Sequence, residues 1–148
     1  MASSTFLQAM EAARDRIRNL GLSDLDSYEV QVRRLPYDAK GNYHRGVTVY
    51  PVPETYDVGT NEREAIGYGL GLALVSNNDN DSDYKLDQLL VWRETIRMDF
   101  IEDASMTGVG TVFTVKVENG HVIDWDAYAG NYDVSKLILR AYSLETRT

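Results

Sequence analysis

The stretch at residues 66–75 reads IGYGLGLALV, and its alternation decides the fold class. A period of two is typical of a β-strand, because successive side chains point to opposite faces of the sheet. One face of this strand carries large side chains, and the other face is nearly bare of side chains. We expect a helix or the backbone of a neighbouring subunit to pack closely against the bare face. The bulky positions are Ile66, Tyr68, Leu70, Leu72 and Leu74, and the small ones are Gly67, Gly69, Gly71 and Ala73.

Further alternating segments predict the other strands. Residues 28–33 and 46–52 precede the central stretch, and residues 111–118 and 136–144 follow it. Pro51 and Pro53 lack N–H donors, so the second of these strands should lie at a sheet edge or end there. We expect residues 54–64 to be irregular. Asn119-Gly120 predicts a tight hairpin turn with a short return strand at residues 121–125.

Two segments show the spacing of helices. Ser3, Ser4 and Thr5 offer N-caps, apolar residues recur every three or four positions up to Leu20, and Gly21 fits a helix end. A second helix is expected at residues 84–101. The sequence therefore predicts a single α+β domain, residues 1–148, with a mostly antiparallel sheet of about five or six strands and two helices packed on one face. The second apolar stripe comprises Leu86, Leu89, Leu90, Ile96, Phe100 and Ile101.

Composition excludes several classes of protein. The net charge of −8 argues against a protein that holds nucleic acid by its phosphates, or one that docks on anionic membranes. The absence of cysteine excludes disulfides and Cys-based zinc sites. No stretch approaches 18 apolar residues and no signal peptide is evident, so we expect synthesis in the cytoplasm and no membrane span.

Partial motifs for metal or nucleotide binding fail on inspection. Asp79, Asp81 and Asp83 match the start of an EF-hand loop, but Tyr84 stands where glycine is needed and Leu90 where glutamate is needed. The glycines of the central strand lack the spacing of a dinucleotide fingerprint. His44 and His121 are the two histidines and do not make a zinc motif. We predict no catalytic residues, no cofactor and no metal site, with weak cation binding at the acidic loop left open.

Tyrosine is abundant, with ten in the chain beside two tryptophans. Five of the tyrosines fall in predicted loops: Tyr37, Tyr43, Tyr56, Tyr128 and Tyr132. Tyrosine is amphipathic and enriched at protein interfaces, although it also anchors loops. Both uses are open from the sequence.

Residues 46–71 read GVTVYPVPETYDVGTNEREAIGYGLG, and this stretch resembles small tail-associated virion proteins of tailed bacteriophages. The order of helices and strands is similar to the tail-terminator family. That resemblance implies a virion protein of the head-to-tail neck that forms a homo-oligomeric ring, commonly a hexamer. Such a ring caps the tail tube, meets the head connector or head-closure protein, and lets DNA pass without specific binding. Assembly would take place in the host cytoplasm.

The resemblance also suggests where contacts would lie. We expect subunit or partner contacts at Pro53, Glu54, Tyr56, Asn61, Glu62 and Arg63. The acidic loop with Asp79, Asp81 and Asp83 would face the lumen or a neighbour. Two alternatives stay open: a head-closure, connector or minor tail protein, or a small ligand-binding module or enzyme with a cleft lined by Tyr and Trp.

Overall fold

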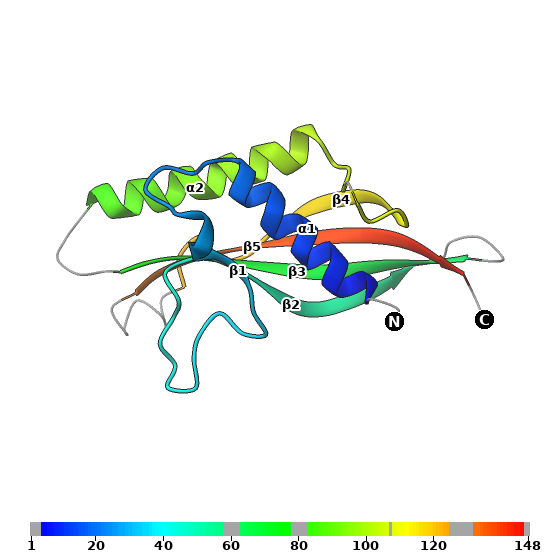
Figure 1. Cartoon of the computed structure of the whole chain (residues 1–148), viewed down its shortest axis with the longest axis horizontal. Helices are drawn as coiled ribbons and strands as arrows, with labels where there is room; N and C mark the ends of the chain where they lie inside the picture. Colours follow the sequence, from blue (N-terminus) through cyan, green and yellow to red (C-terminus); the bar gives the residue numbers. More distant parts are fainter. Residues whose placement is uncertain (1–3, 58–62, 78–82, 107, 125–131, 147–148) are drawn as a thin grey trace.

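A computed structural model describes residues 4–57, 63–77, 83–106, 108–124 and 132–146 (Figure 1). Two helices and a mixed, mostly antiparallel sheet of five strands confirm the predicted α+β class. The elements in chain order are α1 Thr5–Asn19, the 3-10 helix η1 Ser27–Glu29, β1 Val30–Val32, β2 Gly46–Asp57, β3 Arg63–Asn77, α2 Asp83–Glu102, β4 Val112–Asn119 and β5 Tyr132–Thr146.

The strand order is β1-β2-β3-β5-β4, and one pair in it is parallel. β1 runs parallel to β2, with Val30 opposite Val47, and is the one exception in a sheet that is otherwise antiparallel, as predicted. The long connection through residues 33–45 explains the difference, because it carries the chain back to the start of β1 before β2 begins. The other pairs are antiparallel.

β2 and β3 are longer than their sequence patterns predict. After a β-bulge between Val52 and Thr55 the two strands pair again, as far as Asp57 opposite Ala65. The expectation of an irregular stretch at residues 54–64 is therefore wrong at 54–57 and 63–64, because the ladder resumes after the bulge, and residues 58–62 lie outside the described residues. Pro51 and Pro53 lie past the last residue of β2 that pairs with β1, in agreement with the predicted edge.

The predicted hairpin at Asn119-Gly120 does not form. β4 pairs with β5 instead, and the residues after Gly120 bond to β5 as well. The His121 carbonyl accepts from the Lys136 N–H at 2.8 Å, and the Asp124 N–H donates to Val134 at 2.8 Å. The long antiparallel ladder with β5 takes the place of a short local return strand.

The main core joins both helices to one face of β3. The apolar side of α1 and the buried side of α2 lie in the same cluster as Leu70, Leu72 and Leu74. Ser4 caps α1, since its Oγ accepts from the Leu7 N–H at 3.2 Å. The predicted stripe of α2 is partly wrong, because Ile101 is exposed and Trp92 is fully buried. The helix residues buried here are Ala9, Met10, Ala13, Ile17, Leu89, Trp92, Ile96 and Phe100.

The opposite face of β3 carries the glycines. Side chains of the neighbouring strands lie over them: Tyr50 over Gly71, Val52 beside Gly69, and Arg140 over both Gly67 and Gly69. The expectation of a helix against this face is wrong for the described residues, because side chains of β2 and β5 fill the space over the glycines. Packing of a neighbouring subunit on this face stays a prediction. A second small cluster, Ala73, Val75 and Val134 with Tyr43, Tyr50 and Tyr132, covers one end of this face.

Candidate interaction site

Three strands continue past the ends of both helices and form an extension of the sheet (Figure 1). The sheet extension consists of residues 53–57 of β2, residues 63–68 of β3 and residues 142–146 of β5. Residues 63–68 of β3 pair with β5 across this length, from Arg63 opposite Thr146 to Tyr68 opposite Ala141. Phe6 at the start of α1 packs on Tyr68, with ring centroids 5.0 Å apart. The extension therefore joins the core at its base and is free of helices beyond it.

Arg140 fixes the base of this extension. Its Nη1 donates to the Pro53 carbonyl at 2.6 Å, which turns the bulged part of β2 toward the sheet face. Its Nε donates to Glu118 Oε2 at 3.0 Å, and Nη2 donates to the other carboxylate oxygen at 3.4 Å. Arg140 is 7% exposed. One side chain thus ties β4, β5 and β2 together across β3.

Two glycines make room for the arginine. A Cβ at Gly69 would lie 2.8 Å from Arg140 Nη1 and 2.8 Å from the Pro53 carbonyl oxygen. A Cβ at Gly67 would lie 2.8 Å from Arg140 Cδ and closer still to the Thr55 hydroxyl. Any larger residue would displace the side chain that holds the bulge. The glycines at alternate positions in β3 therefore leave the space that the Arg140 side chain occupies.

The exposed side chains of the extension include three of the predicted contact residues. Pro53, Glu54 and Tyr56 are all exposed, and Tyr56 is 68% exposed. The Tyr56 hydroxyl donates to Glu54 Oε1 at 2.8 Å, and this hydrogen bond raises the pKa of Tyr56. Tyrosine held in one orientation by its hydroxyl presents a rigid amphipathic surface, which suits protein contact.

The remaining predicted positions fall at or beyond the limits of what the structure describes. Asn61, Glu62, Asp79 and Asp81 lie outside the described residues. Arg63 begins β3 and Asp83 begins α2, and their side chains are not described. The structure thus brings Pro53, Glu54 and Tyr56 together, and the predicted role of the acidic loop stays a prediction.

The outer edge of β2 is uncovered where it enters the extension. β1 pairs with β2 at Val47, Thr48 and Val49 and no further among the described residues. The Arg33 N–H donates to the Val49 carbonyl at 2.9 Å. The backbone N–H and C=O groups of odd-numbered residues in this part of β2 therefore point away from β3. Pro51 is the next residue whose backbone points away from β3, and proline has no N–H to donate. This edge is poorly suited to adding another strand, so contacts here would use side chains.

A groove of 420 Å³ lies on the sheet face beside the extension. Tyr50, Val52 and Ile138 supply apolar surface, and burial raises the pKa of the Tyr50 hydroxyl. Lys136 lines it too, but its Nζ pairs with Asp124 Oδ2 at 3.0 Å. Trp92 is not part of this groove, because it is buried under α2 and its Nε1 donates to the Ser23 carbonyl at 2.9 Å. Among the described residues, Tyr50 is therefore the one Tyr or Trp that lines this groove, and Trp125 lies outside the described residues.

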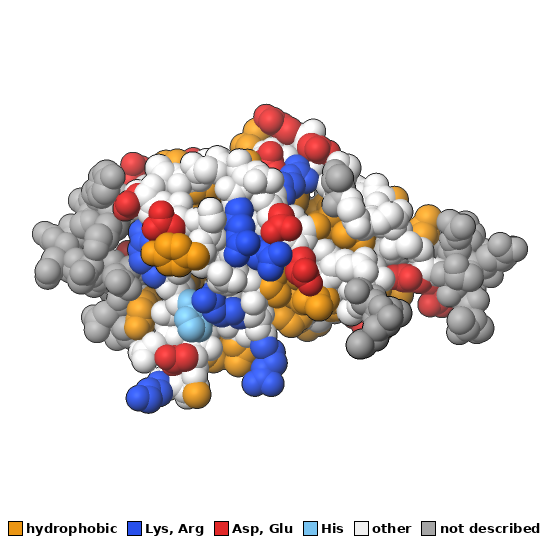
Figure 2. Space-filling view, in the orientation of Figure 1, with side chains coloured by type: hydrophobic (Ala, Val, Ile, Leu, Met, Phe, Trp, Pro, Cys, Tyr) orange, Lys and Arg blue, Asp and Glu red, His pale blue; other side chains and the backbone are white. Residues whose placement is uncertain are grey.

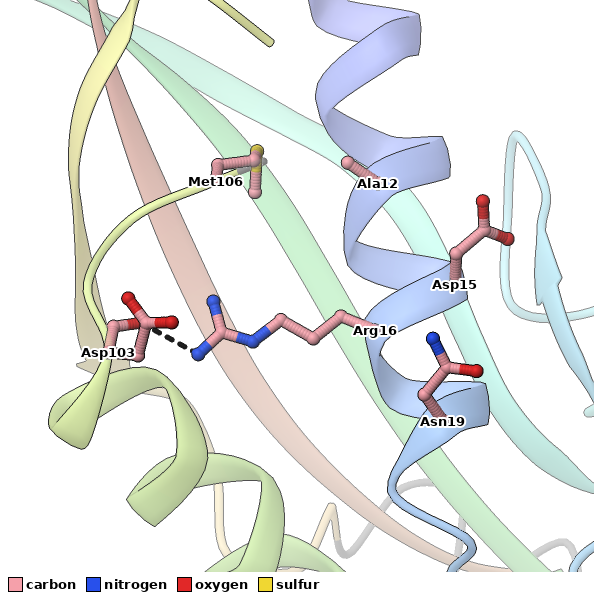
Figure 3. A pocket seen from close by; sticks show the side chains of 6 residues that line it. All are labelled: Ala12, Asp15, Arg16, Asn19, Asp103 and Met106. Carbon is pink, nitrogen blue, oxygen red and sulfur yellow. Dashed lines mark hydrogen bonds between the residues drawn. The ribbon is translucent and has the colours of Figure 1, made fainter. Parts of the chain in front are cut away.

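A hollow of 320 Å³ lies between α1 and the end of α2 (Figure 3). Arg16 crosses it, and its guanidinium donates to Asp99 Oδ2 at 2.6 Å and to the carbonyls of Asp99, Asp103 and Ser105 at 2.8, 2.7 and 2.9 Å. It also lies 4.0 Å from the centre of the Phe100 ring. Asp99 lies in the last turn of α2, and Asp103 and Ser105 follow the end of the helix, where positive charge is favoured. Arg16 thus holds α1 to α2, and its donors are used within the chain.

Replacing Arg16 by alanine should lower the free energy of unfolding by about 1.5 kcal/mol, because charged hydrogen bonds to the end of α2 are lost. Urea denaturation followed by circular dichroism measures the change. Arg14→Ala on the same helix is the matched control, since Arg14 pairs with Asp15, which is 59% exposed. We expect the control to change stability by less than about 0.5 kcal/mol. Equal effects of the two substitutions would contradict the role of Arg16.

Two general features of the described residues complete the picture. Within them, no group of three or more acidic or histidine side chains is placed to hold a metal ion. No helix in this part of the chain combines the length and apolarity needed to cross a bilayer.

Comparison with known proteins adds no further guide, because no family model matches the chain and no curated protein matches it.

Sequence reasoning missed Arg140 and its partner Glu118. Both positions fall in predicted strands, but nothing in the sequence indicates that these two side chains pair across β4 and β5. The signal that could have found Arg140 is the run of glycines in β3. A strand face without side chains leaves room for a long charged side chain from the next strand to lie across it.

Proposed function

We propose that this chain is a structural assembly protein of the phage head-to-tail neck, similar to tail terminators, which forms an oligomeric ring around the DNA channel. It would cap the tail tube and join it to the head connector or head-closure protein. The proposal combines the resemblance of residues 46–71 with the position of that same stretch in the fold. Most of its described part lies in β2 and β3, which carry the sheet extension.

The observation that carries the proposal is the exposed and rigid surface of the extension. Tyr56 is 68% exposed, yet its hydroxyl is held by Glu54. Arg140 fixes the bulge at the base through the Pro53 carbonyl. A preordered surface loses less conformational entropy on binding than a flexible one, which favours assembly contacts.

The charge of the chain is consistent with a DNA channel that does not retain DNA. A protein that binds phosphates with Lys and Arg holds them with an affinity that depends on salt. A net charge of −8 opposes such binding. DNA could therefore slide past a ring of these chains without being held.

The first test concerns self-association through the extension. Tyr56→Ser should weaken self-association about tenfold or more, because tyrosine anchors at interface centres contribute about 2 kcal/mol. Light scattering with size-exclusion chromatography over a range of concentrations measures it. Tyr28→Ser is the matched control, since Tyr28 is 70% exposed and lies in η1, away from the extension. Equal behaviour of the two variants would remove the extension from the interface.

The second test concerns the place of the chain in the particle. Cryo-electron microscopy of purified phage particles that encode this chain should show it as a ring between capsid and tail. Particles that lack the chain by mass spectrometry would overturn the neck assignment. A chain that stays monomeric and binds a small ligand beside Tyr50 would instead favour the ligand-binding alternative.

A further inference from the structure

We propose that residues 33–44 of one copy of this chain dock into a groove on α2 of a second copy, so that copies associate head to tail. This inference rests on the proposed function and names surfaces for the ring contact. It is argued from two patches of opposite charge on opposite faces of the sheet.

The first patch is the basic hairpin, residues 33–44. Arg34 and Lys40 are exposed and have no ion-pair partner among the described residues. Leu35 and Tyr37 lie between them in sequence and are 43% and 38% exposed. Figure 2 shows positive and apolar side chains gathered over this loop, below the sheet. The basic hairpin therefore offers apolar side chains flanked by free positive charge.

The basic hairpin is held in one shape. Tyr37 and Tyr43 form a β-bridge, with ring centroids 5.4 Å apart, and the Tyr43 ring lies 5.8 Å from that of Tyr132 in β5. Asp38 Oδ1 accepts from the backbone N–H groups of Lys40 at 2.9 Å and Asn42 at 3.0 Å. The hydrogen bond from Asn42, joined by that from Lys40, lowers the pKa of the Asp38 carboxyl. A projection that is ordered before binding is suited to docking.

The second patch is the acidic groove, which has a volume of 410 Å³ beside α2. Met98, 46% exposed, supplies its apolar part together with Leu20. Glu94 and Glu102 are exposed and have no ion-pair partner in the described parts of the chain. They lie eight positions apart on the helix, about 12 Å at 1.5 Å per residue. The acidic groove is lined by Leu20, Glu94, Thr95, Met98, Asp99 and Glu102.

The two patches complement each other and face in opposite directions. Free positive charge flanks apolar side chains on the basic hairpin, and free negative charge flanks apolar side chains in the acidic groove. Tyr43 packs with Ala73 and Val75 on one face of the sheet, whereas α2 packs with Leu70, Leu72 and Leu74 on the other. Figure 2 shows acidic and apolar side chains at the top, over the end of α2, and the hairpin at the bottom. A contact between two different patches on opposite faces is heterologous, and such contacts build rings when the rotation closes.

Charge reversal provides the test. The hairpin variant R34E/K40E carries acidic charge on both patches, and the groove variant E94K/E102K carries basic charge on both. Each variant alone should self-associate at least tenfold more weakly than the native chain, measured by light scattering at low ionic strength. A one-to-one mixture of the two should regain native association, because each hairpin then meets a groove of opposite charge.

The quadruple variant R34E/K40E/E94K/E102K is the matched control. It keeps the native net charge and exchanges the signs of the two patches, so it should self-associate like the native chain. All four positions are exposed, and equal melting temperatures would show that the variants fold alike. Added salt at about 0.5 M should weaken the association of the native chain and of the mixture together.

The outcomes separate this inference from the proposed function. Association of the native chain that neither double variant weakens, or a mixture that fails to recover, overturns the docking of hairpin into groove and leaves the neck assignment standing. A native chain that stays monomeric at every concentration also overturns it. Absence of the chain from phage particles is the separate result that overturns the proposed function.

Discussion

Arg140→Ala is expected to lower the free energy of unfolding by about 3 kcal/mol, or the melting temperature by about 10 °C. The substitution leaves the Pro53 carbonyl and the Glu118 carboxylate without their charged partner and opens space over Gly67 and Gly69. Breaking a buried pair by removing one partner costs about 3–5 kcal/mol. We place this case at the lower end because the Glu118 side chain is 42% exposed and regains water. Thermal and urea unfolding followed by circular dichroism measures both quantities.

Lys116→Ala is the matched control for Arg140. Lys116 lies opposite Arg140 on the neighbouring strand but is exposed, and its ammonium lies 5.5 Å from the centre of the Tyr142 ring. Its loss should cost less than about 1 kcal/mol. A change for Arg140→Ala no greater than that for the control would show that Arg140 does not hold the extension to the core.

Gly69→Ala is expected to destabilise the protein by about 2 kcal/mol, although it adds one methyl group. The new Cβ would lie 2.8 Å from both Arg140 Nη1 and the Pro53 carbonyl oxygen, and closer still to Val52. The carbonyl belongs to the backbone and cannot move aside cheaply. We therefore expect the bulge and the hydrogen bond from Arg140 to shift together. Urea denaturation gives the stability, and the amide chemical shifts of residues 54–56 report on the bulge.

Gly110→Ala separates this effect from a general cost of losing glycine. No atom lies within 4 Å of a Cβ built at Gly110, and its φ is outside the left-handed region. Alanine there should be neutral or slightly stabilising, because it reduces the freedom of the unfolded chain. The double variant Gly69→Ala/Arg140→Ala should lose less than the sum of the two single changes, since both disturb one contact. Additive losses would mean that the methyl group and the arginine act independently.

Much of the architecture follows from local patterns in the sequence. The alternation at residues 66–75 identifies β3, and the three-to-four spacing before Leu20 identifies α1. Of the three N-cap candidates Ser3, Ser4 and Thr5, Ser4 caps α1. These features are predictable because the spacing of apolar residues along a short segment shows the period of the element. The spacing is two residues in a strand with one apolar face and three to four residues in a helix with one apolar face. Pro53, Glu54 and Tyr56 are exposed, and their predicted role in contacts stays a prediction.

Strand partners and the roles of the charged residues needed the tertiary structure. Asn119-Gly120 predicts a hairpin by local propensity, but β5 offers β4 a longer ladder. The parallel pairing of β1 with β2 depends on where the 33–45 connection returns the chain. Arg140, Glu118 and Pro53 meet although they are far apart in sequence, because the sheet order places β4, β5 and β2 around β3. The sequence by itself determined the two helices and the central part of each long strand, since period and capping are local. The tertiary structure decided which strands pair and which side chains meet, since those choices depend on competition among distant segments for the same ladder and the same space.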